Sequence, residues 1–223
     1  MSKKILIIVS NASVIGPNNR ATGVYLAEAA HPYIAFEKAG YHIDFASLTG
    51  EVPFLDGMSE KDETENAAFL NGAGWKKMQQ NTKLSDVDAG AYDAIFVAGG
   101  LAPMVDMPEN PVLKKFIAET YERGAVVSAV CHGPVALLNV RLSDGSLLVE
   151  NKSLTSFTTV EEDNYARQDV PFDLQEALAN QGARFQAGEP WAEHSVVDGN
   201  LVTGQNPASA GKTARNVILI LER

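Results

Sequence analysis

The sequence predicts an α/β protein in three layers, with a mostly parallel sheet between two layers of helices. Short runs of β-branched and aliphatic residues alternate along the chain with segments of helical periodicity, a pattern typical of a parallel sheet covered on both faces. The chain has 223 residues, of which 45% are hydrophobic. That is enough for one sizeable core, so we expect residues 1–223 to form a single domain.

The elements follow from these runs in chain order. We expect strands at 5–10, 42–47, 94–98 and 126–130, and later ones near 154–157, 184–186, 195–197 and 201–203. We expect helices near 23–39, 111–123, 134–138, 174–181 and 208–221. Asn206 is expected to cap the last helix, with Pro207 at its first position.

One segment interrupts the alternation of strands and helices. Residues 56–91 are polar and contain the helix-forming stretches "ETENAAFL" and "WKKMQQ". A long connection of this kind inside a compact domain is usually functional. We interpret it as an insertion or lid over the sheet rather than a second domain.

Charge and cysteine content limit the class of partner. The formal net charge is -10 at pH 7, which argues against nucleic acid or an anionic membrane because both carry the same sign. The first apolar segment is shorter than the ~7–15 residues of a signal-peptide core, and the chain has one cysteine, so no disulfide can form within it. We therefore expect a cytoplasmic protein that acts on a neutral or electrophilic small molecule.

That cysteine lies in "SAVCHGPVAL", directly after the strand expected at 126–130. A sharp turn from strand to helix exposes the residue at its apex, at the sheet edge where α/β proteins bind ligands. Gly133 permits such a turn, and Pro134 suits the first turn of a helix whose N-terminus would favour a thiolate. We interpret Cys131 as a nucleophile; the alternative is a small buried thiol at a strand end.

A second loop offers hydrogen-bond donors for an oxyanion. The strand expected at 94–98 ends in Gly99-Gly100, and glycines let backbone N–H groups approach a ligand closely. The amides of Gly100 and His132 are our candidates for an oxyanion hole, against the alternative of a plain Gly-Gly turn. Adjacent side chains diverge, so the His132 ring need not contact the sulfur.

Glu28 is the candidate for acid–base chemistry. It lies in the apolar stretch "TGVYLAEAAHPYIAF". Pro32 cannot donate the helical hydrogen bond to the Glu28 carbonyl, so we expect the helix to kink or end there. A carboxylate in apolar surroundings has a raised pKa and can share a proton with a nearby thiolate. The alternative is a glutamate that faces solvent.

These residues, together with "SLTSFTTVEED" and "PWAEHSVVDGNLVTGQNPASA", resemble the ThiJ/PfpI superfamily over nearly the full chain. Within this superfamily, the sequence more closely resembles the glyoxalase III and heat-shock-chaperone-like branch. It implies the class I glutamine amidotransferase-like fold, a three-layer flavodoxin-like sandwich with a nucleophile elbow.

The resemblance also implies the roles of four residues. The nucleophile falls on Cys131, its adjacent histidine on His132 and the proton-shuttling glutamate on Glu28. The carboxylate that orients the histidine falls on Glu162 when "FTTVEED" is aligned through its Phe and first Val. The residues on either side of it, a glutamate and an aspartate, stay open as alternatives.

Two features differ from related proteins. Relatives often carry a histidine after the glycine pair, where this chain has Leu101, so we expect no metal site there. Class I amidotransferases use a distant His-x-Glu, whereas Glu193 directly precedes His194 here, so a glutaminase is not expected. We interpret His31 and His42 as structural, and leave open whether His31, one turn from Glu28, lines the pocket.

The resemblance implies a glutathione-independent, cofactor-free lyase that converts methylglyoxal or glyoxal to lactate or glycolate through a Cys131 hemithioacetal. No G-x-G-x-x-G follows the first strand, where "SNASVIGPNN" stands instead. The alternatives are a cysteine-dependent amidase, peptidase or protein deglycase, and a holdase chaperone or oxidative-stress sensor. The family also implies a homodimer, with a small reactive dicarbonyl as substrate.

Overall fold

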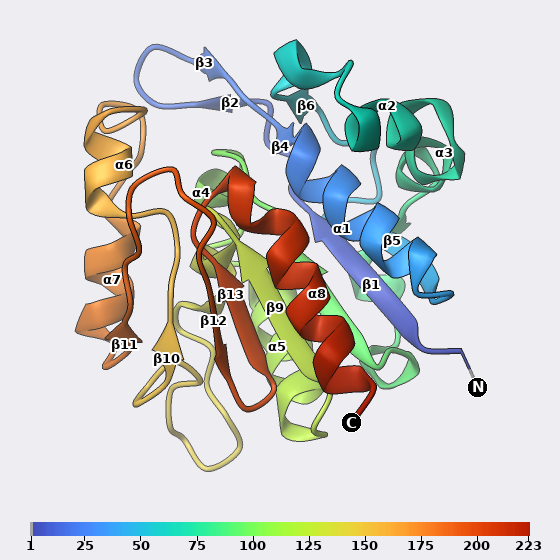
Figure 1. Ribbon diagram of the computed structural model, residues 1–223. Helices are drawn as coiled ribbons and strands as arrows, with labels where there is room; N and C mark the ends of the chain where they lie inside the picture. Colours follow the sequence, from blue (N-terminus) through green and yellow to red (C-terminus); the bar gives the residue numbers. More distant parts are fainter. Residues whose placement is uncertain (1) are drawn as a thin grey trace.

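The protein, described by a computed structural model over residues 2–223, has the predicted α/β fold (Figure 1). Its central sheet has seven strands in the order β12–β13–β9–β8–β1–β5–β7. Neighbouring strands are parallel except for β12 and β13. The strands are β1 (Lys4–Val9), β5 (His42–Ser47), β7 (Thr82–Lys83), β8 (Ala94–Val97), β9 (Val126–Val130), β12 (Ser195–Asp198) and β13 (Leu201–Gly204).

The middle strands are apolar because both of their faces are covered. β8 and β9 are buried at every position, and β1 is buried from Ile5 onward. Along β1, Ile5 and Ile7 belong to one hydrophobic cluster, whereas Leu6 and Ile8 belong to a second. This alternation is the two-residue period of a strand, so the sheet separates two cores.

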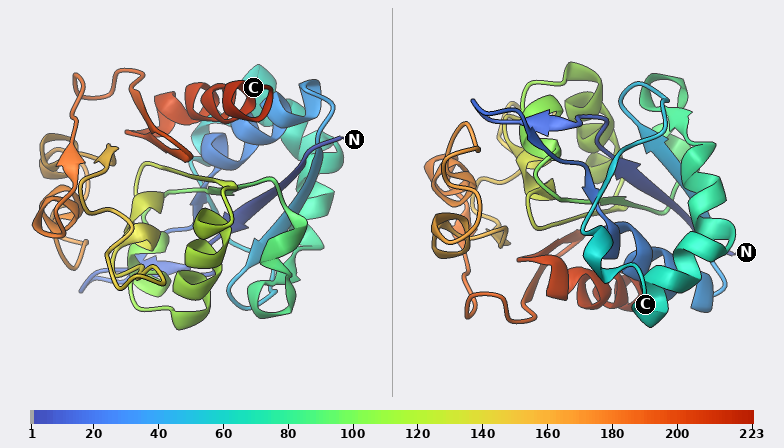
Figure 2. Two further views of the ribbon diagram at one scale, coloured as in Figure 1. Left: turned by 90° about the horizontal axis from the view of Figure 1, so that it is seen from below. Right: turned by 90° about the horizontal axis from the view of Figure 1, so that it is seen from above.

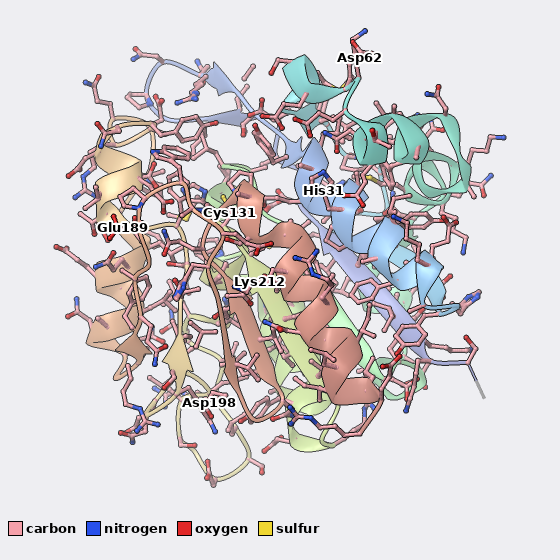
Figure 3. The ribbon with its side chains drawn as sticks, viewed as in Figure 1. His31, Asp62, Cys131, Glu189, Asp198 and Lys212 are labelled. Carbon is pink, nitrogen blue, oxygen red and sulfur yellow. The ribbon has the colours of Figure 1, made fainter. Side chains whose placement is uncertain are left out.

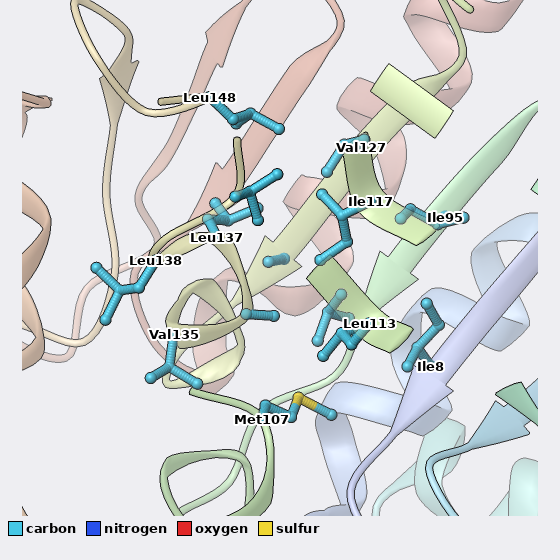
Figure 4. Close-up of a cluster of buried hydrophobic side chains, with 14 of the residues drawn as sticks. Ile8, Ile95, Met107, Leu113, Ile117, Val127, Val135, Leu137, Leu138 and Leu148 are labelled. Atoms are coloured by element: carbon cyan, nitrogen blue, oxygen red, sulfur yellow. The ribbon is translucent and has the colours of Figure 1, made fainter. Parts of the chain in front are cut away.

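Each core is closed by helices (Figure 2). α1 (Leu26–Lys38) and α8 (Ala210–Leu221) pack side by side on one face of the sheet. α5 (Pro111–Glu122) covers the other face. Figure 4 shows its Leu113 and Ile117 among side chains of β1, β8 and β9.

Short elements connect these layers. The remaining strands are β2 (Val14–Ile15), β3 (Arg20–Ala21), β4 (Val24–Tyr25), β6 (Leu55–Asp56), β10 (Ser153–Leu154) and β11 (Arg184–Phe185). The remaining α-helices are α2 (Thr64–Asn71), α3 (Ala73–Gln79), α4 (Pro103–Asp106), α6 (Thr159–Asp163) and α7 (Leu174–Asn180). The 3₁₀ helices are η1 (Met58–Glu60), η2 (Leu84–Asp86), η3 (Ala89–Ala91), η4 (Gly133–Leu137) and η5 (Pro207–Ser209).

All eight expected strands are present, but two lie outside the central sheet. β10 and β11 pair only with each other among the described strands, in parallel. The helix expected from residue 23 begins at Leu26, because β4 first pairs with β6. The element after Cys131 is a 3₁₀ helix of five residues rather than an α-helix.

The capping expected at Asn206 is wrong, and of the kink or end expected at Pro32 the end does not occur. The Asn206 side chain makes no capping hydrogen bond; instead it donates to the Glu161 carboxylate and to the Ala192 carbonyl. Helix α1 does not end at Pro32 but continues to Lys38.

Residues 55–79 lie beside α1, whereas η2 and η3 of the same segment pack with α5 on the other face of the sheet. Helix α2 packs on α1, α3 packs on β5, and β7 adds an edge strand to the sheet. Phe69 and Met78 of these helices are fully buried in the same cluster as α1. The role of this segment as a lid stays a prediction. Within residues 2–223, no helix combines the length and hydropathy required to span a bilayer.

The elbow after β9 requires glycine. A Cβ at Gly133 would lie 2.6 Å from the backbone oxygen of Val97, which cannot move without distorting β8. We expect Gly133→Ala to lower the free energy of unfolding by about 2 kcal/mol, measured by urea denaturation. The control is Gly211→Ala in α8, where the nearest atom is the flexible end of Arg215 at 3.2 Å; it should raise stability by roughly 0.5–1 kcal/mol. Equal effects of the two substitutions would contradict the steric argument.

Candidate active site

Cys131 occupies a strained turn at the carboxyl end of β9 (Figure 3). Its φ is 61°, in the left-handed region that residues other than glycine rarely adopt. Its N–H donates to the Gly204 carbonyl at 2.9 Å, and its carbonyl accepts from the Phe157 N–H at 2.8 Å. Two neighbouring segments therefore hold this conformation, as is common at functional sites.

The Gly-Gly loop approaches the cysteine so closely that both glycines are required. A Cβ at Gly99 would overlap a carboxyl oxygen of Glu28 and lie 2.9 Å from the Cys131 Cβ. Gly100 has a φ of 89°, and a Cβ there would overlap the Gly23 carbonyl. The loop thus brings backbone N–H groups to the thiol.

The His132 ring reaches both the thiol and a carboxylate. Its Nδ1 lies 3.4 Å from the Cys131 Sγ, and its Nε2 lies 2.6 Å from an oxygen of Glu162. The expected divergence of adjacent side chains does not keep the ring from the sulfur, because the left-handed backbone at Cys131 breaks the regular strand geometry. The tautomer that donates from Nε2 to Glu162 leaves Nδ1 facing the sulfur.

Of the three acidic residues in "VEED", Glu162 is the one that meets the histidine. Asp163 points away and pairs with Arg167 at 3.1 Å. Glu161 is fully buried but accepts hydrogen bonds from Thr158 and from the segment that contains Trp191. The structure therefore places Glu162, the residue that the family resemblance selected, beside the His132 ring.

Glu28 is fully buried in the first turn of α1, so the alternative of a solvent-facing glutamate is wrong. Neither carboxyl oxygen has a hydrogen-bond partner of ordinary geometry among the described residues. Burial raises the pKa of Glu28 to about 8, against smaller lowering effects of the nearby Cys131 thiol and the N–H groups of Gly99 and Gly100. At neutral pH this carboxyl mostly keeps its proton.

A cavity of about 60 Å³ lies against these groups. It is lined by Tyr25, Gly100, Cys131, His132, Phe157, Tyr165, Trp191 and Pro207. A larger cavity of about 480 Å³ lies between the β2–β3 hairpin and α4 and contains none of the expected site residues. The smaller cavity is the candidate active site because Cys131, His132 and Gly100 line it. Glu28 and Glu162 are not in its lining; they contact it through Cys131 and His132.

Comparison with known proteins agrees with this geometry. The model of the DJ-1/PfpI family matches residues 20–219. The chain belongs to this family. It is 34% identical to Glyoxalase 3 of Candida albicans, over 100% of this chain and 99% of that protein. It is 33% identical to a glutathione-independent glyoxalase of Saccharomyces cerevisiae, over 95% of this chain and 94% of that protein.

Solved structures of similar sequence share the whole fold. The crystal structure of glyoxalase III from Candida albicans has a TM-score of 0.87 at 32% identity and covers 98% of this chain and 97% of its own. The 24 kDa Rapid Encystment Protein of Francisella tularensis has a TM-score of 0.92 at 32% identity and covers 98% and 99%. The predicted resemblance to the superfamily and to its glyoxalase III branch is thereby confirmed.

The protonation of the thiol in this DJ-1/PfpI protein differs from the expectation. The sequence favoured a lowered pKa for Cys131, from a helix N-terminus. Instead burial raises its pKa well above the ordinary value, and a negative charge on Glu28 would raise it further, while the N–H groups of Gly100 and His132 lower it. The short 3₁₀ helix η4 cannot offset desolvation. The thiol and Glu28 therefore titrate as a coupled pair.

The sequence missed the walls of the cavity, and the structure decides the alternative left open for His31. Tyr25, Tyr165 and Trp191 come from three distant segments, and no local pattern linked them. His31 does not line the cavity; its Nε2 lies 3.9 Å from a carboxylate oxygen of Glu65 in α2.

Leu101 is buried in the core, and no group of three or more potential metal-binding side chains occurs within residues 2–223.

The raised pKa of Glu28 predicts a pH-dependent stability. Above pH 4.5 the unfolded chain releases this proton, whereas the folded protein keeps it until pH is about 8. The free energy of unfolding should therefore fall by a few kcal/mol as pH rises from 5 to 8. Glu28→Gln has no such proton and should flatten this slope in urea denaturation, whereas Glu37→Gln, at an exposed position of the same helix, should keep it. Parallel slopes for wild type and Glu28→Gln would contradict the assignment.

Proposed function

We propose that this protein is a glutathione-independent glyoxalase that converts methylglyoxal to lactate and glyoxal to glycolate. The observation that carries the proposal is the fully buried carboxyl of Glu28, which lies beside the lone thiol and has no partner of ordinary hydrogen-bond geometry among residues 2–223. Such a pair can exchange protons with a substrate bound to the sulfur. Relatives that cover the full chain are named glyoxalases, and the cavity has room for a small carbonyl compound only.

The first step is addition of the Cys131 sulfur to the aldehyde carbon. The reactive form of the coupled pair holds one proton, on Glu28, so that Cys131 attacks as a thiolate. The sulfur electron pair forms the C–S bond, the carbonyl π pair moves to oxygen, and the oxygen takes the Glu28 proton, which gives a hemithioacetal and leaves Glu28 as a carboxylate. The Gly100 and His132 N–H groups face the sulfur and would stabilise the developing oxyanion. A protonated Glu28 lets the thiol ionise without a second negative charge beside it.

The second step moves a proton between two adjacent carbons. Glu28, as carboxylate after the first step, removes the proton from the former aldehyde carbon, and the C–H electron pair forms the C=C bond. The proton of the first hydroxyl passes to the second carbonyl oxygen, so the intermediate is an enediol in its anionic form. Glu28 returns a proton to the neighbouring carbon, which leaves a thioester of the 2-hydroxyacid on Cys131. One carbon is oxidised and the other is reduced, so no external electron acceptor takes part.

The third step is hydrolysis. Water attacks the thioester carbonyl, the C–S bond breaks, and the thiolate leaves while the hydroxyacid is released. The ring of His132, with Nδ1 toward the sulfur and Nε2 held by Glu162, would take the proton from water and return it to Cys131. The sum is addition of one water to the dicarbonyl.

The alternatives receive less support. A roomy, open site would favour a peptidase or deglycase, whereas this cavity is about 60 Å³ and mostly enclosed. Chaperone or stress-sensor activity and a homodimer stay predictions from the family, and a cytoplasmic location stays a prediction from the sequence. If a Cys131→Ser variant still protected client proteins from heat, the chaperone activity would be independent of catalysis by Cys131.

The proposed function predicts lactate formation from methylglyoxal without glutathione, and its loss in Cys131→Ala. Alanine fits the same turn, so circular dichroism and the melting temperature should stay close to wild type. Lactate is measured enzymatically after incubation at neutral pH. Substantial turnover by Cys131→Ala would refute the covalent mechanism, and absence of turnover by folded wild type would refute the function.

The two carboxyls should differ in their effect on turnover. Glu28→Gln keeps the size but loses proton exchange, so turnover should fall by ~10²–10⁴-fold. Glu162→Gln should cost less, because its amide oxygen can still accept the hydrogen bond from His132. Steady-state turnover of methylglyoxal by both variants measures this difference. Near-normal turnover by Glu28→Gln would transfer the acid–base role to His132.

A further inference from the structure

The outer wall of the cavity at Cys131 is formed by aromatic rings that are partly exposed. Trp191 is 47% exposed and Tyr165 is 38% exposed, although both line this cavity. We propose that Trp191 determines the size of the carbonyl compound that reaches Cys131, and that Glu161 positions it. The part that concerns substrates rests on the proposed function.

Trp191 is held in an unfavourable backbone conformation. Its φ is 63°, which is costly for a bulky residue. It lies in residues 186–194, which form no helix or strand. Its ring contacts Phe157 and Tyr165, with centroids 5.4 Å and 6.1 Å away. Regular structure does not impose this position, so a specific contact must.

That contact is the Glu161 carboxylate. One oxygen accepts from the Trp191 N–H at 2.7 Å and from the side-chain amides of Gln205 and Asn206 at 3.1 Å and 2.8 Å. The other oxygen accepts from the N–H and hydroxyl of Thr158. Five donors satisfy a group that is fully buried.

Glu161 thereby positions two residues of the cavity wall, Trp191 and Pro207. It holds Trp191 directly, and through Asn206 it holds the adjacent Pro207, which also lines the cavity. Its own position is set by the hydrogen bonds with Thr158 that begin α6. The next residue of this helix contacts His132, so one short helix aligns the histidine and the wall.

The other outer rings have polar or charged partners, and Trp191 does not. The Tyr25 hydroxyl donates to Glu60 at 2.6 Å. The Arg20 guanidinium lies 4.7 Å from the centre of the Tyr165 ring. The indole N–H of Trp191 has no hydrogen-bond partner within residues 2–223. Truncation of this side chain should therefore open the cavity without breaking a polar network.

The test compares reagents of different size at Cys131, the only thiol of the chain. Trp191→Ala should increase alkylation by N-phenylmaleimide about tenfold more than alkylation by iodoacetamide. The ratio of kcat/KM for phenylglyoxal to kcat/KM for methylglyoxal should rise by a similar factor in Trp191→Ala relative to wild type. Such a factor is typical of the substrate discrimination that one pocket contact provides. The matched control is Trp75→Ala, at the second tryptophan, in α3, which should leave both ratios unchanged.

The positioning role has its own readout. Glu161→Gln replaces an oxygen acceptor by an NH₂ donor, so it should raise both size ratios in the same direction as Trp191→Ala. Unchanged ratios in Trp191→Ala would overturn the proposal, even if Glu161→Gln did not fold. If the alkylation ratio shifts but wild type converts no methylglyoxal, the wall assignment stands and the glyoxalase function fails.

Discussion

The left-handed turn at Cys131 is the constraint on which the site depends. It is held by one backbone hydrogen bond to Gly204 and one from Phe157, so the strand on one side and the crossing segment on the other both fix it. With the backbone turned in this way, Sγ meets the glycine loop at 99–100 and the carboxyl of Glu28. A regular strand end would direct the side chain into one of the two cores. The strain is therefore the cost of bringing a nucleophile to a cavity.

Three buried carboxyls surround this turn, and each is accommodated differently. Glu28 has no partner of ordinary hydrogen-bond geometry among residues 2–223, and burial raises its pKa to about 8, so it holds a proton at neutral pH. Glu162 meets the ring of His132. Glu161 accepts from five donors. A buried carboxyl must be protonated, paired or hydrogen-bonded, and here the three solutions coincide with three roles: proton exchange, orientation of the ring, and placement of the wall.

The cavity adds a further physical effect. Its aromatic lining leaves few polar partners besides the backbone N–H groups of Gly100 and His132. Hydrogen bonds and charges act more strongly where water is excluded. This favours the proposed enediol chemistry, in which charge appears on substrate oxygens close to those donors. Exclusion of water also explains why the short helix η4 does not lower the Cys131 pKa below its ordinary value, since desolvation has the larger effect on that pKa.

The sequence by itself determined the layered fold and the cysteine turn, because apolar runs and a Gly-Pro junction are local patterns. It left Glu28 either buried or facing solvent, and the structure decided for burial. A family resemblance selected Glu162 among adjacent acidic residues. Only the tertiary structure decided that the thiol pKa is raised and that Trp191 closes the cavity. The reason is physical. Desolvation and cavity shape sum contributions from segments as distant in the sequence as Tyr25 and Pro207, and no local pattern encodes such sums.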